Sequence, residues 1–253
     1  MRESFGASAG SAGEVELLDT SVSANGKVSA LPATLLHAEG VTKRWQRGRL
    51  SVLQSVDLGV ERGTLLSIVG ANGVGKTTLL RILAGLILPD AGSVRLDGLD
   101  PKKDRAAYQR RIGLLPAGYG GMYARLTVRQ QLGFSARISF VPAARRQLGV
   151  DEALARFGLF ELSGRRLDRL SMGQRQRVRL AITFLHQPDL VLLDEPWNSL
   201  DTEGEHLLAA TLIELRSRGG SAICCTPTGI ELARNVNNID RVLRLEAGSL
   251  HTE

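Results

Sequence analysis

A glycine-rich turn between an apolar run and a helical segment is the feature of this sequence that most restricts its fold. Residues 64–69 (TLLSIV) are almost continuously apolar, which is typical of a strand buried on both faces of a sheet. The segment after the turn, residues 77–86, has helical apolar spacing. The turn fits the pattern G-x-x-x-x-G-K-[ST] and consists of Gly70, Ala71, Asn72, Gly73, Val74, Gly75, Lys76 and Thr77. This strand–loop–helix unit predicts an α/β fold of the P-loop NTPase type.

The chemistry of this turn suits a phosphate chain. Glycines let the backbone curl so that successive N–H groups face one anion, and the next helix presents its positive N-terminal end to the same place. We expect Lys76 to neutralise the β- and γ-phosphates of ATP and the Thr77 hydroxyl to ligate Mg²⁺. Residues 70–77, with Thr78, are therefore predicted to bind nucleotide; the alternative is an ordinary glycine turn.

A second apolar run ends in two acids. Residues 190–193 (LVLL) predict another buried strand, and Asp194 and Glu195 follow it directly. Ligands of parallel sheets gather beyond the carboxyl ends of the strands, so this pair is expected near the phosphate loop. We expect Asp194 to hold Mg²⁺ through water and Glu195 to be the catalytic residue that polarises the attacking water. Taken alone, such a pair would also fit a simple turn.

Composition limits the class of protein without selecting a partner. The chain has 253 residues, of which 43% are hydrophobic and 23% charged, enough for one α/β domain with a sizeable core. Its formal charge is +6, with 27 Arg and 5 Lys. This balance fits nucleotide, nucleic acid or lipid headgroups as partners, and equally a solvated surface. The adjacent Cys224 and Cys225 form no disulfide or metal motif and indicate buried hydrophobic positions in a reducing compartment.

The organisation along the chain predicts one domain with an insertion. Residues 1–34 are rich in Ser, Ala and Gly and are expected to be a flexible N-terminal extension. Residues 35–41 and 52–60 predict strands of an antiparallel or mixed edge sheet. Residues 222–225 predict a buried strand of the parallel or mixed core sheet, and residues 242–245 the last strand. An inserted helical subdomain is expected over about residues 118–170, with a capping box formed by Thr127 and Gln130. No run of about 18 apolar residues is present, so no membrane span is expected.

Between the two motifs lies a third, Leu170-Ser171-Met172-Gly173-Gln174, followed by Arg-Gln-Arg and an apolar helix. At this point the chain resembles the ATP-binding cassette family, whose signature is L-S-G-G-Q. Ser171 lies 95 residues after Lys76 and 23 before Asp194, and both spacings look like those of the family. The D-loop position holds Asn198-Ser199-Leu200-Asp201. The resemblance covers about residues 35–250 and implies an ATPase domain over residues 35–253.

The resemblance also implies how the signature works. A serine and free N–H groups at a helix N-terminus can bind anionic oxygen. In the family this end contacts the γ-phosphate held by another subunit, so Ser171, Met172, Gly173 and Gln174 would act in trans, beside Ser199 and Asp201 of the D-loop. The alternative is a helix simply capped by serine. Trp45, 25 residues before Gly70, is expected to stack on adenine; the alternative is a Trp packed in the edge sheet.

Two positions depart from the family, and both concern hydrolysis. After the strand of residues 111–116, relatives usually carry Gln, whereas this chain has Ala117; after residues 222–225 they carry Thr-His, whereas this chain has Thr226-Pro227. Pro227 has neither a polar side chain nor a backbone N–H, and the four His residues (37, 186, 206 and 251) are remote in sequence. We therefore expect slow hydrolysis, unless the alignment slips or Thr226 or Thr228 replaces the histidine.

The resemblance implies the subunit of an ABC transporter that binds ATP and Mg²⁺ at a dimer interface. The expected partners are an integral membrane permease and a second ABC subunit, identical or different, with no nucleic acid. The expected location is cytoplasmic, peripheral on the inner face of the membrane through the permease. Residues 126–134 (LTVRQQLGF) and the Gly-Gln-Arg-Gln-Arg run look most like exporter cassettes, and residues 117–140 would receive the permease. The alternatives are a soluble assembly or nucleic-acid-associated ATPase and a non-catalytic regulatory partner.

Overall fold

The structure of the protein, a computed structural model, describes residues 34–45, 50–118, 120–227 and 239–252. In chain order the strands are β1 (Thr34–Trp45), β2 (Leu50–Glu61), β3 (Leu65–Val69), β4 (Ala91–Leu96), β5 (Ile112–Leu115), β6 (Leu190–Asp194), β7 (Ser221–Thr226), β8 (Arg241–Glu246) and β9 (Ser249–Thr252). The α-helices are α1 (Lys76–Leu83), α2 (Arg105–Arg110), α3 (Val128–Ile138), α4 (Arg146–Arg156), α5 (Met172–Phe184) and α6 (Thr202–Ser217). Short 3₁₀ turns span Ala143–Arg145, Phe160–Leu162 and Leu167–Arg169.

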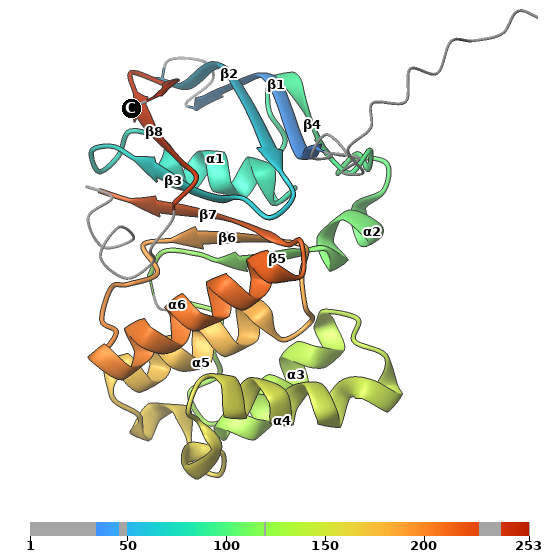
Figure 1. The fold of residues 1–253 in the computed structure, drawn as a ribbon, viewed down its shortest axis with the longest axis vertical. Helices are drawn as coiled ribbons and strands as arrows, with labels where there is room; N and C mark the ends of the chain where they lie inside the picture. The colour runs from blue at the N-terminus through green and yellow to red at the C-terminus, as the bar shows by residue number, and fades with distance from the viewer. Residues whose placement is uncertain (1–33, 46–49, 119, 228–238, 253) are drawn as a thin grey trace, which may run out of the picture. The chain divides into compact units, whose positions relative to one another are not determined.

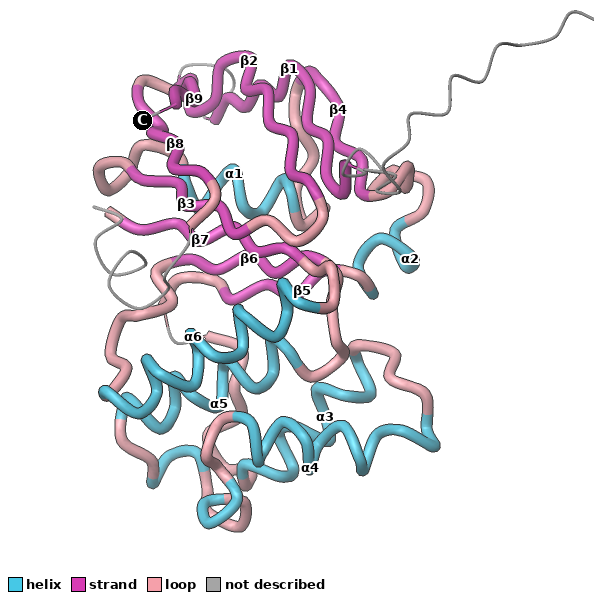
Figure 2. Tube along the Cα trace, in the orientation of Figure 1, coloured by secondary structure: helices cyan, strands magenta, loops and turns pink. Residues whose placement is uncertain are grey.

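The described strands form two sheets. One is antiparallel, with the order β2-β1-β4, and the other has the order β5-β6-β7-β3-β8-β9. In the second sheet the paired strands run parallel, except that β9 is antiparallel to β8. Figure 2 shows the strands of both sheets in magenta, with α1 between them. The phosphate loop leaves the carboxyl end of β3, which lies between β7 and β8 in the parallel part of the sheet.

Both faces of the parallel sheet are covered, which explains its continuous apolar runs. Leu190 and Leu192 of β6 belong to a core shared with α1 and the antiparallel sheet. Val191 and Leu193 belong to the core on the opposite face, under α5 and α6. Figure 1 shows the same layers, with α1 on one side of the sheet and α5 and α6 on the other. Helices α3 and α4 extend the second core away from the sheet.

The predicted fold class is confirmed, with corrections of detail. The expected edge strands are present and longer than predicted, and Thr34, assigned to the N-terminal extension, begins β1. The capping box is present: the Thr127 hydroxyl accepts from the Gln130 amide at 3.2 Å, and the Gln130 side chain accepts from the Thr127 amide at 3.0 Å. Residues 242–245 are not in the last strand, because β9 follows and pairs with β8. Residues 1–33 lie outside the described part, so the predicted extension and the domain boundaries stay predictions.

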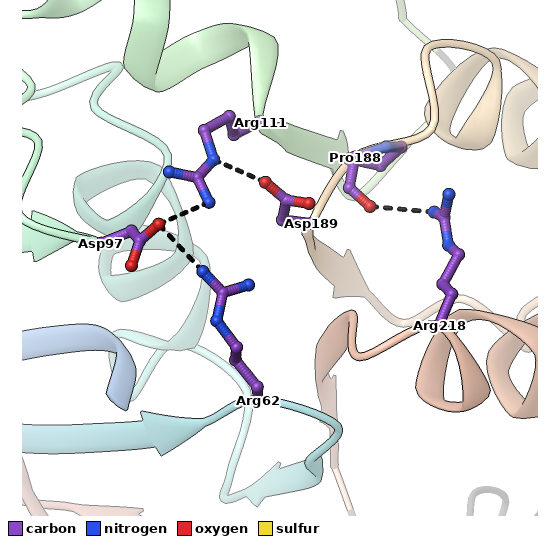
Figure 3. A network of polar contacts seen from close by, with 6 residues as sticks. All are labelled: Arg62, Asp97, Arg111, Pro188, Asp189 and Arg218. Atoms are coloured by element: carbon purple, nitrogen blue, oxygen red, sulfur yellow. Dashed lines mark hydrogen bonds and ion pairs between the residues drawn. The ribbon is translucent and has the colours of Figure 1, made fainter. Parts of the chain in front are cut away.

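An ion-pair network joins the two sheets at the amino ends of the parallel strands, opposite the phosphate loop (Figure 3). Arg111, just before β5, contacts Asp97 at 2.9 Å and Asp189 at 2.5 Å. Arg62, after β2, contacts the same Asp97 oxygen at 2.9 Å. The hydrogen bond from Arg111 is the largest of the effects that lower the pKa of Asp97. Nearby, Arg218 donates to the carbonyl of Pro188 at 2.9 Å.

Candidate nucleotide-binding site

The phosphate loop is closely fitted between neighbouring strands, which explains two of its glycines. Gly70 has φ 154°, and a Cβ there would lie 2.5 Å from the carbonyl oxygen of Leu245 in β8. Gly75 has φ 116°, and a Cβ there would lie 2.9 Å from Val52 Cγ1 and 3.0 Å from its carbonyl oxygen in β2. Any side chain would therefore clash with backbone, and the positive φ at each position favours glycine.

Lys76 lies inside this loop rather than in solvent. Its side chain is 5% exposed, and its Nζ donates to the carbonyl of Gly70 at 2.5 Å and to that of Ala71 at 3.0 Å. Because an ammonium has three donors, the group is held by its own loop and keeps a donor for a phosphate. The cradle of backbone around a buried cation fits an anion, as the motif predicts.

The predicted magnesium ligands meet although they are far apart in sequence. Thr77 Oγ1, in the first turn of α1, donates to Asp194 Oδ2, at the end of β6, with a distance of 2.6 Å. A hydroxyl and a carboxylate are hard oxygen donors of the kind that Mg²⁺ takes together with phosphate oxygens. The residues present therefore fit a magnesium ion at the end of the loop.

Glu195 follows Asp194 in a constrained conformation. Its φ is 50°, which is uncommon outside glycine, and its amide donates to the carbonyl of Cys225 at 2.9 Å. Asn198 Nδ2 donates to Glu195 Oε2 at 2.5 Å. The neighbouring strand and the following turn thus fix both the backbone and the carboxylate of Glu195, which is the arrangement that a preorganised base needs.

One open cavity of about 380 Å³ gathers these groups. It is lined by Trp45, Val52, Asn72, Gly73, Gly75, Lys76, Thr77, Thr78, Asp194 and Glu195. Trp45, at the end of β1, is 41% exposed, and Lys43 Nζ lies 5.0 Å from the centroid of its ring. The ring is therefore partly exposed and lies at the wall of the cavity, and its stacking on adenine stays a prediction.

The signature residues lie away from this cavity. Ser171 caps α5: its hydroxyl accepts from the Gln174 amide at 3.2 Å, and the Gln174 side chain accepts from the Ser171 amide at 3.1 Å. Met172 is 54% exposed at the first turn. None of the four signature residues lines the phosphate-loop cavity, so within one chain the two motifs do not form a single site.

The D-loop residues lie beside the signature. A Cβ on Gly173 would lie 3.1 Å from the carbonyl oxygen of Ser199 and 3.7 Å from Asp201 Oδ2. Ser199 has φ 64°, and Asp201 caps α6 by accepting from the Gly204 amide at 2.8 Å. The D-loop therefore connects the Glu195 turn to the signature end of α5.

The two positions that depart from the family both lie next to the site. Ala117 lines a second cavity, of about 170 Å³, together with Asp194 and Glu195. The carbonyl oxygen of Pro227 accepts from the amide of Gly70 at 3.4 Å, which puts residue 227 beside the start of the phosphate loop. None of the four histidines lines either cavity. Thr228, the other suggested substitute, lies outside the described residues.

Sequence reasoning did not single out two residues of α5 that line the second cavity, Gln176 and Arg179. Both are buried, with 2% and 6% exposure. In the sequence the two residues are simply polar positions of a helix whose buried side also contains Arg177 and Thr183. Their burial is visible only once the orientation of the helix is known.

These features together define a P-loop ATPase: a glycine cradle with a buried lysine, a hydroxyl–carboxylate pair and a fixed glutamate at the carboxyl ends of a parallel sheet. Residues 53–198 match the sequence model of the ABC transporter family. This chain belongs to that family, as an ATP-binding subunit with ATPase activity. Within the described residues, no helix is both long and apolar enough to cross a lipid bilayer.

Similar proteins agree with this assignment. The chain is 33% identical over 220 residues to the daunorubicin resistance ATP-binding protein DrrA3 of Streptomyces coeruleorubidus, covering 87% of this chain and 68% of that protein. It is 34% identical over 228 residues to the methionine import ATP-binding protein MetN 2 of Burkholderia mallei, covering 88% of this chain and 57% of that protein. A solved ATP-binding subunit of an ABC transporter superposes with a TM-score of 0.77 at 25% identity, over 87% of this chain and 90% of that one.

Proposed function

We propose that the chain binds Mg–ATP in the phosphate-loop cavity, at the interface with a second ABC subunit, and couples binding and hydrolysis to export by a membrane permease. One observation carries the proposal: Lys76, Thr77, Asp194 and Glu195, from two distant segments, line a single cavity. The Thr77–Asp194 distance of 2.6 Å supports a shared magnesium ion.

Each residue has a role that its geometry supports. Lys76 neutralises the β- and γ-phosphates, and the loop amides bind their oxygens. Thr77 and Asp194, the latter through water, would hold Mg²⁺, which would supply positive charge to offset the charge that develops on the phosphates. Glu195 accepts a proton from the attacking water while Asn198 holds its second oxygen. Stacking of adenine on Trp45 contributes about 1–3 kcal/mol.

Hydrolysis is proposed to be slow at this site. Ala117 and Pro227 line or border the site without a side-chain donor. Losing one preorganised donor at a developing anion costs about 2.7–4 kcal/mol, or roughly 100–1,000-fold in rate. Glu195 is retained and oriented, so the site is proposed to be slow rather than inactive.

A second subunit would complete the site. The exposed helix end at Ser171 and Met172 lies outside the phosphate-loop cavity of its own chain, which supports its use by a neighbouring nucleotide site. Amides at a helix N-terminus can bind the γ-phosphate. The partner is a second copy or a related cassette with a more complete hydrolytic site, to which this chain would lend its signature.

The permease is proposed to dock on the helical part of the chain. Four large apolar or aromatic side chains of this part are exposed to solvent. Their exposed fractions are 57% for Tyr123, 38% for Phe134, 58% for Ile138 and 59% for Phe140. Tyr123 and Phe134 pack edge to face, with ring centroids 5.2 Å apart. Exposed apolar side chains that lie together, as Tyr123 and Phe134 do, mark protein contacts. Docking there would hold the subunit at the inner face of the membrane, on the cytoplasmic side.

The proposed direction of transport is export. Relatives include proteins named for drug resistance and for methionine import, so their names do not distinguish export from import. Export is proposed from the likeness of residues 126–134 to exporter cassettes. A soluble assembly or nucleic-acid-associated ATPase is the second candidate, and the basic charge of +6 is the observation in its favour.

Two measurements test the proposal. The purified Glu195→Gln variant should double in mass by light scattering when Mg–ATP is added, alone or with a partner cassette, and Lys76→Ala should abolish this change. Affinity-tagged chain from a mild detergent extract should co-purify with a polytopic protein, and Phe134→Glu should release it while ATP binding stays intact. Failure to bind Mg–ATP would refute the whole proposal, whereas loss of the membrane partner alone would favour the soluble alternative.

A further inference from the structure

A buried arginine on α5, together with a neighbouring glutamine, connects this helix to the segments that follow β5 and β6. Arg179 is 6% exposed, and its guanidinium donates to Gln176 Oε1 at 2.7 Å and to the carbonyl of Pro116. Gln176 Nε2 in turn donates to the carbonyl of Pro196 at 3.0 Å. Pro116 precedes Ala117, and Pro196 follows Glu195. The Gln176–Arg179 pair therefore fixes the exits of β5 and β6 to the same helix.

The same pair lines the cavity of about 170 Å³ that also contains Ala117, Gly118, Asp194, Glu195 and Asn198. Ala117 and Gly118 contribute no side-chain donor to its wall. The polar groups that face the two acids across this cavity therefore come from α5 and from Asn198. Among the residues that line the cavity, Arg179 is the one with a positive charge.

Burying a guanidinium costs free energy, even when it is hydrogen-bonded. An apolar side chain of similar length would fill the interface between α5 and the sheet without that cost. The position instead holds a permanent cation with a rigid fork of donors, next to the carboxylates that bind metal and activate water.

We propose that Arg179 is a positioning residue for ATP hydrolysis, which rests on the proposed function. Its guanidinium holds the Ala117–Gly118 turn at a fixed place relative to Glu195 and supplies a fixed positive charge at the wall where residue 117 offers no polar group. Because the signature serine, Ser171, caps the N-terminus of α5, the same contact connects the signature helix to the catalytic carboxylate.

The test compares Arg179→Met with Arg218→Met in the full-length chain. Arg218 is the control for loss of an arginine–carbonyl hydrogen bond. It also donates to a proline carbonyl beside β6, that of Pro188, but at the opposite end of the strand and from an exposed position (Figure 3). Two probes are titrated: a non-hydrolysable ATP analogue with Mg²⁺ for the ground state, and Mg–ADP with aluminium fluoride for the transition state.

Arg179→Met should weaken binding of the transition-state mimic by about 100-fold, as displaced catalytic groups do, and binding of the ATP analogue by less than about threefold. Arg218→Met should leave both affinities within about threefold. Adding Ala117→Gln to Arg179→Met should recover about tenfold for the mimic, because the amide restores a polar group to the same wall. If Arg179→Met fails to fold, Arg179→Lys should weaken binding of the transition-state mimic by about tenfold and leave binding of the ATP analogue within about threefold.

Four results would overturn the inference: equal weakening of both probes by the Arg179 variants, no weakening of the mimic, no recovery with Ala117→Gln, or a wild-type chain that binds the ATP analogue but not the mimic. A wild-type chain that binds neither probe would instead refute the proposed function itself. The two failures are therefore distinguishable in one set of titrations.

Discussion

Replacing Pro227 by histidine should increase the rate of ATP hydrolysis. Residue 227 directly follows β7, next to the phosphate loop, where its carbonyl accepts from the Gly70 amide at 3.4 Å. Its side chain is exposed, so the change opens no cavity in the core. An imidazole there would add a donor toward the terminal phosphate that proline cannot supply.

The size of the effect follows from the value of one such donor. Removing a preorganised donor costs about 100–1,000-fold in rate. A single introduced imidazole has no evolved neighbours that orient it, so it would be less well preorganised than the donor of a complete site. We therefore expect kcat to rise by about 30-fold in Pro227→His, below the full range for a preorganised group, with little change in the Kd for Mg–ATP.

The assay is phosphate release at saturating Mg–ATP, with Kd measured separately by titration with a non-hydrolysable analogue. Pro227→Ala is the matched control, since it restores the backbone N–H without an imidazole, and it should change kcat by less than about threefold. A Pro227→His rate no higher than that of Pro227→Ala would refute the reasoning, as would a wild-type chain that already turns over several ATP per second.

Three further predictions concern binding and stability. Lys76→Ala should weaken ATP binding by about 10–100-fold, because charge-assisted hydrogen bonds contribute about 1.5–3 kcal/mol each. Calorimetric titration measures the Kd, and an unchanged value would contradict the binding of ATP phosphates by Lys76. Trp45→Ala should weaken ATP binding by about 1–3 kcal/mol of stacking, whereas Trp45→Phe should retain most of it; equal affinities would show that the ring does not stack. The pKa of Asp97 is lowered in the folded chain, chiefly by the hydrogen bond from Arg111 (Figure 3). The ionised Asp97 therefore stabilises the fold fully above its unfolded pKa of about 3.9, and this stabilisation is lost as the pH falls through the lower folded pKa. Asp97→Asn should therefore flatten the fall in the free energy of unfolding below about pH 4, measured in urea at several pH values; an unchanged slope would exclude this role.

The sequence predicted the parts of this protein that depend on local pattern. The turn that ends in Lys76, the acids after β6 and the capping box at Thr127 each lie within about ten residues, so propensity, glycine requirements and apolar runs were enough to place them. Helix α6 was not predicted, because Asp201 was assigned to the D-loop rather than read as the N-cap that it also is. Strands β4 and β9 and helix α2 are short or largely exposed, and such segments carry little periodic signal.

Contacts between distant segments were decided by the tertiary structure. Thr77 and Asp194 are 117 residues apart and share a hydrogen bond, and Trp45 reaches the nucleotide cavity because β1 ends there. The place of Arg179 under the Ala117 turn could not be predicted, because only the packing of α5 against β5 and β6 determines which of its polar side chains are buried. The sequence determined which chemical groups are present and the local shape of the loop; the parallel sheet, by aligning the carboxyl ends of its strands, determined which of those groups meet.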